Sequence, residues 1–522
     1  MADWAKYAMV DRKADVESCS RHLGKLSCLD HRKSAILLYM AYLSSHTDRL
    51  PDHKELYQFL VACQQASLEK GCTQIASISV PIPRVDPLAV LQILGGTQSF
   101  QFYLEKRKEN EAILAIDATI YAELEGINRF QHAKTVIHNY LKDTWIWLQQ
   151  NQTISFSGPH FFCFFTFFAL NQPSPFRAAT IFLPRWQVAF RENSGTVVAN
   201  VQVDPHVNIK RLLQDLYNQI AEIKFSEHKP SSLTRINCSP FIPPKSINTE
   251  AFKSAVVAAL NFIDANEFSK IVLANAVDIF SHQPFNLVHS LDNLRQRHPD
   301  CYIFCASNGK GQNFLGASPE RLISIRDHLL VTDALAGSAP RGRTASEDAE
   351  FGDRLLGSEK EQREHQFVLD FITQRLSELG LIPQYLPAPQ LLKLSNIQHL
   401  WTPIQAQLFT NVHPLDIVAQ LHPTPAVAGV PTQIAQEQIR RYETFDRSLY
   451  AAPLGWIDYQ GNCEFIVGIR SALIDSNPSS LNHDNTYRAR LYAGAGIVAG
   501  SDPDKELAEI QLKLQALLKA LL

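Results

Sequence analysis

The sequence has no apolar stretch long enough to cross a bilayer as a helix. Its longest apolar run, residues 161–170, is interrupted by Thr166 and falls short of the roughly 20 residues that a spanning helix needs. Residues 1–6 also lack the apolar core of a secretory signal peptide. We therefore expect a cytoplasmic protein with no membrane partner.

The sequence also lacks the cysteine pattern of a disulfide framework and the charge of a nucleic-acid binder. Its nine cysteines are an odd number at irregular spacing, which favours reduced core thiols and a reducing compartment. Its formal net charge is −3, whereas nucleic-acid binders usually carry a basic patch. A small anionic ligand needs only local positive charge, so the net charge does not exclude one.

What is present is the composition of an ordinary globular protein. Apolar residues make up 45% and charged residues 19% of a chain of 522 residues, which is long enough for a large core. Residues 454–459 and 463–474 flank a Gln-Gly-Asn turn, and residues 301–307 with 314–317 give a second hairpin signal. Hairpins among clustered helices predict an α+β fold with large antiparallel sheets rather than a parallel doubly wound sheet.

Hydrophobic periodicity predicts where the other elements lie. Helices are predicted at residues 34–44, 55–70, 209–224, 249–265 and 358–378, and residues 110–123 and 131–149 have mixed or helical periodicity. Strands are predicted at residues 74–80, 161–170, 178–183, 196–203 and 270–280. The chain therefore begins with helices and changes character near residue 76.

The stretch from residue 491 to residue 513 is typical of a strand, a glycine loop and a helix. Glu506, Glu509 and Lys513 have the spacing that puts side chains on one helical face. Glycine N–H groups, a helix N-terminus, carboxylates and an ammonium would suit a small anion held with a divalent cation. A capped surface helix with an ordinary Glu–Lys pair has the same pattern.

Four more polar residues stand in apolar surroundings. Glu364 lies on the apolar face of a predicted helix, where a carboxylate must find a partner. Glu320 follows Pro319 at a strand end, Lys270 opens an apolar strand, and Arg470 lies in another strand, as carboxylate-binding arginines often do. Taken alone, Glu364 is better explained by a structural salt bridge than by a metal. Solvated strand ends are the alternative for Glu320 and, strongly, for Lys270, and an internal ion pair is the alternative for Arg470.

Together and in this order, these stretches resemble the chorismate-utilising enzyme family, and within it the isochorismate synthases. The resemblance covers about residues 252–515, through residues 270–274, 316–320, 335–338, 361–365, 422–431, 469–471 and 494–513. The N-terminal half matches loosely, mainly around residues 161–185. The resemblance implies two large, mainly antiparallel sheets packed together with helices outside. It also implies one compact unit made of an N-terminal region, 1–250, and a chorismate-binding region, 251–522.

The resemblance further implies a Mg²⁺ ion, held through Glu364 and Glu509 and bridging to the ring carboxylate of chorismate. Arg470, Lys513 and the amides of residues 494–496 would hold the substrate carboxylates. The full set of implied substrate contacts is Ala336, Gly337, Ser338, His399, Ala426, Arg470, Gly494, Ala495, Gly496 and Lys513. Relatives suggest a monomer whose partner is its substrate.

Three positions discriminate among the nucleophiles that family members use. Ammonia-using relatives such as anthranilate synthase carry Gln where this chain has Lys270, and they tend to carry Thr where it has Ala426. Aminodeoxychorismate synthases can use a lysine at the position of Ala336. The resemblance therefore implies water as the nucleophile and an isomerase activity, isochorismate synthase. In that reaction, water adds at C2 of chorismate and the C4 hydroxyl leaves.

This reaction assigns two roles. Lys270 would be the general base and must be a neutral amine to take a proton from water. Glu320 would be the general acid, so its pKa should be raised. A salicylate synthase, which forms the same intermediate and then eliminates pyruvate, is the alternative that the motifs scarcely separate. The N-terminal region, about 250 residues long, looks more like the menaquinone- or phylloquinone-pathway isochorismate synthases. A catalytically inactive chorismate-binding subunit is a third hypothesis. The presence of the acid, the base and both metal ligands argues against it.

Overall fold

A computed structural model describes residues 53–149, 154–169, 174–224, 249–395, 397–409, 412–478 and 486–521. The helix predicted at residues 34–44 lies outside these ranges. The described residues from Lys54 onward belong to one compact unit, Lys54–Leu522. In this part of the chain, no helix has both the length and the apolar character needed to span a membrane.

The elements in chain order are as follows. The strands are β1 (Gln74–Pro83), β2 (Phe100–Lys106), β3 (Glu111–Leu124), β4 (Thr144–Leu148), β5 (His160–Phe165), β6 (Ala179–Arg191), β7 (Ser194–Val203), β8 (Lys270–Ser281), β9 (Tyr302–Asn308), β10 (Gln312–Ser318), β11 (Arg321–Arg326), β12 (Leu329–Pro340), β13 (Gln384–Tyr385), β14 (Gln390–Lys393), β15 (Ile397–Gln407), β16 (Gly429–Val430), β17 (Pro453–Asp458), β18 (Cys463–Val467), β19 (Ser471–Asp475) and β20 (Tyr487–Val498). The helices are α3 (His53–Lys70), α4 (Pro87–Leu94), α5 (Arg129–Lys142), α6 (Ile209–Lys224), α7 (Thr249–Asp264), α8 (Leu287–Arg297), α9 (Ala345–Leu356), α10 (Glu359–Glu378), α11 (Pro414–Leu421), α12 (Thr432–Tyr442) and α13 (Pro503–Leu521), with a short 3-10 helix at Arg107–Glu109.

Two arms of antiparallel strands leave β6. One runs β3-β2-β9-β10-β19-β20-β8-β16, and the other runs β5-β17-β18-β11-β12-β15, with β13 and β14 also paired to β15. Strand β7 adds β1 and β4 on the remaining edge, and β1–β4 is the one parallel pairing among the described strands. The predicted α+β class with large antiparallel sheets is confirmed. Because β2 pairs with β9 and β5 with β17, strands from before and after residue 250 share the same sheets.

Side chains from both arms form an aromatic core. Phe102 of β2 packs on Phe162 of β5 with ring centroids 5.1 Å apart, and Phe162 packs on Phe182 of β6 at 5.5 Å. All three rings are fully buried. Strand β5 is buried at every position, which explains its unbroken apolar sequence.

Both stretches with mixed or helical periodicity contain a strand. Residues 110–123 form most of β3, so a helix there is wrong, whereas residues 131–149 are helical up to Lys142 and then form β4. In β3, residues 112–116 are buried in succession, and such a short apolar run does not separate helix from strand by its periodicity. In β4, the sequence Trp-Ile-Trp favours a strand, and β4 satisfies its backbone groups against β1.

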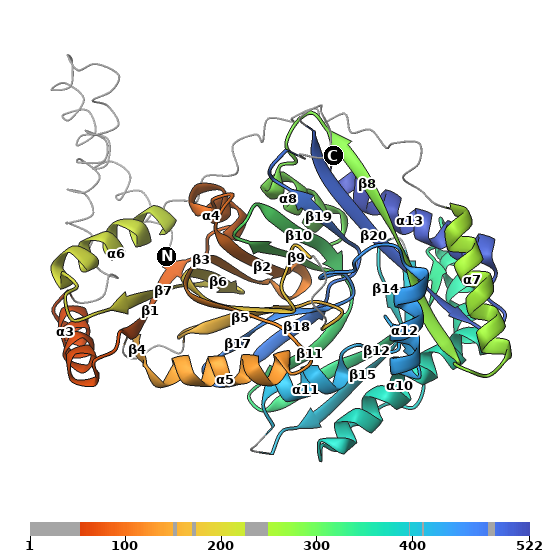
Figure 1. The fold of residues 1–522 in the computed structure, drawn as a ribbon, viewed down its shortest axis with the longest axis horizontal. Coiled ribbons are helices and arrows are strands. Elements are labelled where there is room, and N and C mark those ends of the chain that lie inside the picture. The colour runs from red at the N-terminus through yellow and green to blue at the C-terminus, as the bar shows by residue number, and fades with distance from the viewer. Residues whose placement is uncertain are drawn as a thin grey trace, which may run out of the picture. The chain divides into compact units, whose positions relative to one another are not determined.

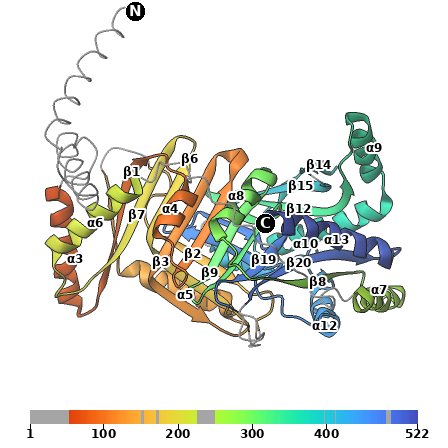
Figure 2. The same ribbon diagram turned by 90° about the horizontal axis from the view of Figure 1, so that it is seen from above.

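Helices gather around the end of the molecule that carries β8 and β20. Helices α7, α10, α12 and α13 lie around these two strands, whereas α3 and α6 lie at the opposite end (Figures 1 and 2). Helix α13 directly follows β20 in the sequence and packs against it. This end is where most of the predicted site residues lie.

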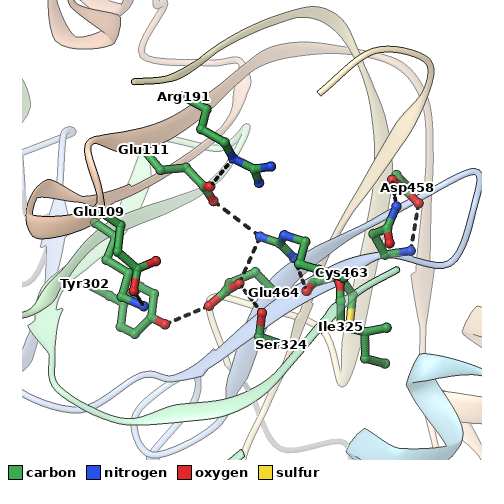
Figure 3. Close-up of polar contacts among 12 residues, drawn as sticks. Glu109, Glu111, Arg191, Tyr302, Ser324, Ile325, Asp458, Cys463 and Glu464 are labelled. Carbon is green, nitrogen blue, oxygen red and sulfur yellow. Dashed lines mark hydrogen bonds and ion pairs between the residues drawn. The ribbon is translucent and has the colours of Figure 1, made fainter. Parts of the chain in front are cut away.

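A buried polar network joins the two arms (Figure 3). Glu464 of β18 accepts hydrogen bonds from Tyr302 Oη and Ser324 Oγ, both at 2.7 Å, and from Arg326 Nη2 at 3.0 Å. Arg326 also pairs with Glu111 of β3 at 3.2 Å. Tyr302 and Glu111 belong to one arm and the other residues to the second, so Glu464 stabilises the packing between them.

Replacing Glu464 with glutamine is expected to lower the free energy of unfolding at pH 7 by about 3 kcal/mol, because the partly buried Arg326 loses one of its two charged partners and the hydroxyls of Tyr302 and Ser324 lose a charged acceptor. Burial opposes ionisation of Glu464, but Arg326, Lys106, Arg321 and the hydrogen bond from Tyr302 together outweigh it and lower the pKa of this carboxyl. A lowered carboxyl pKa adds stability above its unfolded value, and that stability is lost as pH falls through the folded value. The difference between the variant and the wild type should therefore shrink in denaturant titrations below about pH 4.

Glu350→Gln is the control for this prediction. Glu350 pairs with Arg354 on the surface, where both side chains are more than 60% exposed. Loss of such a pair should change stability by less than about 1 kcal/mol. Equal effects of the two substitutions would contradict the role given to Glu464.

Candidate active site

A cavity of about 110 Å³ lies among β12, β20, α10 and α13. All predicted site residues except Lys270 and Ala495 line it. These are Glu320, Ala336, Gly337, Ser338, Glu364, His399, Ala426, Arg470, Gly494, Gly496, Glu509 and Lys513. Residues up to 193 positions apart in the sequence, Glu320 and Lys513, therefore meet around one space, as the ordered motifs led us to expect.

Lys270 and Ala495 lie just outside this lining. Lys270 is completely buried, and its Nζ lies 2.8 Å from Glu364 Oε1, so it reaches the cavity wall through that carboxylate. The amine makes this ion pair but no well-directed hydrogen bond to a described residue. Ala495 is buried, and as the residue between Gly494 and Gly496 it projects from the opposite face of β20.

The expected glycine loop is wrong, because Gly494 and Gly496 lie inside β20. They pair with Ala274 and Val272 of β8. Their lack of side chains serves close approach instead: a Cβ on Gly496 would lie 2.7 Å from Glu364 Oε1, and one on Gly494 would lie 2.7 Å from Tyr450 Oη. The glycines therefore open the strand surface to the groups that face it.

Arg470 lies at a break between two strands. The single strand predicted over residues 463–474 is divided into β18 and β19, and Arg470 between them has φ = 50°. Such a conformation is unfavourable for a non-glycine residue and is often found at functional sites. It places the guanidinium beside His399, with Nη2 2.9 Å from His399 Nε2.

The contact with Arg470 fixes the form of His399. A guanidinium only donates, so His399 Nε2 must accept, and Nδ1 carries the proton that it donates to Gly337 O at 3.3 Å. Burial, followed by the charges of Arg470 and Lys513, holds the pKa of His399 well below its ordinary value. The imidazole is therefore neutral and leaves the positive charge of Arg470 available to a ligand.

A β-bulge shapes the wall that Ala336, Gly337 and Ser338 form. The pairing of β12 with β15 shifts register between Ala336 and Ser338, and Gly337 has φ = 75°. The bulge turns the Ser338 N–H toward Glu361, whose Oε2 accepts it at 3.1 Å. Bulges beside active sites commonly re-aim single groups in this way.

Carboxylates gather on the other side of the cavity. Ser358 caps α10, which carries Glu361 and Glu364, and Asp502 caps α13, which carries Glu506 and Glu509. Burial raises the pKa of Glu361 and of Glu506, and the nearby charges of Glu364 and Glu509 add to both shifts. These carboxylates are therefore close enough to repel one another. Each still has a cation nearby: Lys360 lies 3.5 Å from Glu506, and Lys270 and Lys513 pair with Glu364 and Glu509.

Lys513 links the carboxylates to the glycine strand. Its Nζ donates to Gly494 O at 2.8 Å and pairs with Glu509 Oε1 at 2.7 Å. Burial opposes ionisation of Glu509, but Lys513 lowers the pKa of this carboxyl below its ordinary value. Glu509 is therefore an anion at neutral pH, and Lys513 and Arg470 both line the cavity as cations.

Comparison with known proteins assigns this arrangement to a family. The family described as chorismate binding enzyme matches residues 60–522. The chain belongs to this family. Its resemblance to the chorismate-utilising enzymes, predicted from the motifs, is confirmed.

Several relatives of this chorismate-binding enzyme are named isochorismate synthases. It is 30% identical over 448 residues to isochorismate synthase MenF of Escherichia coli, across 85% of this chain and 93% of that relative. It is 40% identical over 272 residues to the salicylate biosynthesis isochorismate synthase of Pseudomonas aeruginosa, across 52% of this chain and 54% of that relative. The solved structure of Escherichia coli MenF matches with a TM-score of 0.69 at 26% identity, covering 89% of this chain and all of that one.

An anthranilate synthase component I from Streptococcus pneumoniae has the same fold. Its structure matches this chorismate-binding enzyme with a TM-score of 0.60 at 19% identity and covers 78% of this chain and 92% of that one. The predicted fold class thus holds for relatives with different chemistry, so the reaction has to be argued from the site.

Glu320 is the buried acid of this chorismate-binding enzyme. It lines the cavity and is 6% exposed. Burial raises the pKa of Glu320 to about 7, with a further contribution from Asp333 and against the opposing charges of Lys270 and Arg470. The predicted direction of this shift agrees with the structure, and a large fraction of Glu320 is protonated at neutral pH.

Sequence reasoning missed several residues of the cavity wall. Tyr450 lines it and stacks on Tyr492, with ring centroids 5.2 Å apart. Val427 and Ile469 also line it. No local pattern marks the two tyrosines, but Val427 and Ile469 each lie beside a predicted site residue and within a matched motif. Adjacency to a motif residue was thus the signal that could have found them.

Proposed function

We propose that this chorismate-binding enzyme is an isochorismate synthase, an isomerase that converts chorismate to isochorismate. The observation that carries the proposal is Glu320, a buried carboxyl whose pKa of about 7 suits a general acid. It faces a cavity that also holds two cations and no enzyme nucleophile at Ala336. Relatives named isochorismate synthase support the same activity.

The cations of the site would bind the substrate. Chorismate carries two carboxylates, and Arg470 and Lys513 both line the cavity. An arginine fork suits a planar carboxylate, and the neutral form of His399 leaves that fork charged. Arg470 and Lys513 would therefore bind one carboxylate of the substrate and fix its orientation.

The second carboxylate would be held with Mg²⁺. The donors here are hard carboxylate oxygens, the ligands that Mg²⁺ prefers, and a bound cation would relieve the mutual repulsion of these carboxylates. Within the described ranges, no three His, Cys, Asp or Glu side chains are grouped closely enough to hold a metal ion. Glu364 and Glu509 with water and substrate would suffice, because Mg²⁺ usually keeps several non-protein ligands. When bound, the ion offsets substrate charge and fixes the ring.

The acid and the base then divide the reaction. Lys270 would act in its neutral form, with its ion pair to Glu364 given up, and take a proton from the water whose oxygen forms the bond to C2. The double bonds of the ring shift, and the C4–O bond breaks. Glu320 gives its proton to the departing hydroxyl, which leaves as water. Lys270 reaches the cavity beside Gly496, whose missing side chain leaves room there: a Cβ would lie 3.4 Å from Lys270 Cε.

Incubation of the protein with chorismate and Mg²⁺ in ¹⁸O-labelled water is expected to give isochorismate with one label at C2. Ala336 cannot attack the ring, and Ala426 stands where ammonia users tend to carry Thr, so the new oxygen should come from solvent. Chromatography with mass spectrometry measures the label, and a coupled assay measures pyruvate. Ammonium at high concentration should not be incorporated.

Three results would contradict this assignment. Unlabelled isochorismate would mean transfer of the hydroxyl within the substrate and would remove Lys270 as the base toward water. Stoichiometric pyruvate with salicylate would make the protein a salicylate synthase and leave the first chemical step as described. Unchanged chorismate would favour the inactive binding subunit.

A further inference from the structure

A buried ion pair lies directly behind the cavity wall. Arg447 is fully buried and is the largest side chain of the described residues to be so, and Glu443, four residues earlier, has a side chain only 4% exposed. Neither residue lines the cavity. Nothing in the reaction described above uses them.

Both side chains of the pair make several hydrogen bonds to the surrounding backbone and to each other. Arg447 donates to both carboxylate oxygens of Glu443, at 2.8 and 2.6 Å, to Val427 O at 2.9 Å and to Val272 O at 2.8 Å. Glu443 Oε1 also accepts the N–H of Ala274 at 2.8 Å. The guanidinium lies 4.4 Å from the centre of the Phe167 ring. These contacts fix the position of both side chains.

The pair takes the place of a strand beside β8. Strand β16 contacts only the start of β8, through Gly429 and Val430, and the last backbone bond on this side runs from Val272 N–H to Ala428 O at 2.7 Å. Beyond it, the carbonyl of Val272 and the N–H of Ala274 would lack partners. Arg447 supplies a donor to the first and Glu443 an acceptor to the second.

Three parts of the cavity wall depend on these bonds. Val272 and Val427 both line the cavity, and Arg447 holds the carbonyl of each. Tyr450, which also lines it, follows Arg447 by three residues, and its ring centre lies 5.8 Å from the guanidinium. Lys270 lies two residues before Val272, so its side chain leaves β8 on the same face.

We propose that the Glu443–Arg447 ion pair is a positioning device for the reaction, which sets the spacing between β8, residues 426–428 and Tyr450. The proposal rests on the proposed function, because it concerns the base on β8 and the wall that faces it. A buried ion pair is poor evidence for stability alone, since an apolar pair of similar volume often serves as well. The guanidinium of Arg447 donates to two carbonyls and a carboxylate at once, and no apolar side chain can replace it in that role.

Arg447→Lys tests the proposal, because it keeps the charge and loses the fork. We expect kcat to fall about 10- to 100-fold, the scale of an error of about 1 Å in the position of reacting groups. The KM for chorismate should change less than about 3-fold, because Arg470 and Lys513 remain in place. Glu443→Gln keeps an oxygen acceptor for Ala274 and should give a smaller loss of kcat in a folded protein.

Arg490→Lys is the matched control. Arg490 forms a two-bond ion pair with Asp278, both contacts at 2.7 Å, between the same two strands β20 and β8, and neither residue lines the cavity. We expect Arg490→Lys to lower the melting temperature and to leave kcat within about 2-fold of the wild type. The reason is that this pair holds no backbone group of the cavity wall, so its loss affects stability rather than the position of the reacting groups.

The measurements are kcat, KM and melting temperature for the wild type and the three variants, at a temperature where all are folded. Wild-type kcat in Arg447→Lys would overturn the proposal, and so would equal losses of kcat in Arg447→Lys and Arg490→Lys. If Arg447→Lys does not fold, Glu443→Gln decides by the same comparison. An inactive wild type would instead refute the proposed function, so the two failures are distinguishable.

Discussion

Replacing Glu320 with glutamine is expected to lower kcat by about 10²-fold or more, because the departing hydroxyl loses its proton donor. Lys270→Ala should have an effect of similar size, because the attacking water then loses its base. Chorismate binding should survive in both, since neither residue is assigned to a substrate carboxylate. Steady-state kinetics with equilibrium binding of chorismate measure the two effects separately. Near-wild-type turnover in either variant would reject the role given to that residue.

The pH dependence gives Glu320 a second test. The acid must be protonated, and its pKa is about 7, so kcat/KM should fall as pH rises through about 7. Because the folded pKa lies above that of the unfolded chain, wild-type stability is full below about pH 4 and declines as pH rises through 7. Glutamine stays neutral, so Glu320→Gln should be more stable than the wild type at pH 8 by on the order of 3 kcal/mol. Denaturant titrations at pH 8 and pH 4 should show this gain at the first pH and not at the second.

The sequence was a better guide to which residues form the site than to the local backbone structure around them. Glu364 was conspicuous because a carboxylate stood on an apolar helical face, and the structure does bring it to the cavity beside Lys270. Such conflicts between local pattern and residue type are expected at functional positions. The residues of the matched motifs met around one cavity because the fold of the family brings them together.

Local conformation was predicted less well where tertiary contacts decide it. Gly494 and Gly496 suggested a loop, yet they lie in a strand because other residues approach their faces. Arg470 fitted a continuous strand, yet the chain breaks there at a positive φ. No sequence pattern marked Arg447 as part of the site, because the carbonyl groups that it binds lie 20 and 175 residues away in the sequence. The predictions of a cytoplasmic monomer that binds neither nucleic acid nor membrane stay predictions.

Removing Mg²⁺ with a chelator is expected to abolish turnover, and added Mg²⁺ should restore it. The physical reason is charge: Glu364 and Glu509 line this side of the cavity, and burial with their negative charge already raises the pKa of the neighbouring Glu361 and Glu506. A substrate carboxylate would add to this repulsion unless a cation is bound.

Glu364→Gln and Glu509→Gln should each reproduce the loss of turnover, because each removes a charged ligand. Differential scanning fluorimetry gives a readout that does not depend on turnover: Mg²⁺ with chorismate should raise the melting temperature of the wild type and not of these variants. Asp504→Asn is the matched control on α13, because Asp504 is 78% exposed and pairs with Lys253 away from the cavity. It should keep both turnover and the shift in melting temperature. Full activity in excess chelator would refute the two-carboxylate site, and an unchanged shift in Glu364→Gln would remove Glu364 from it.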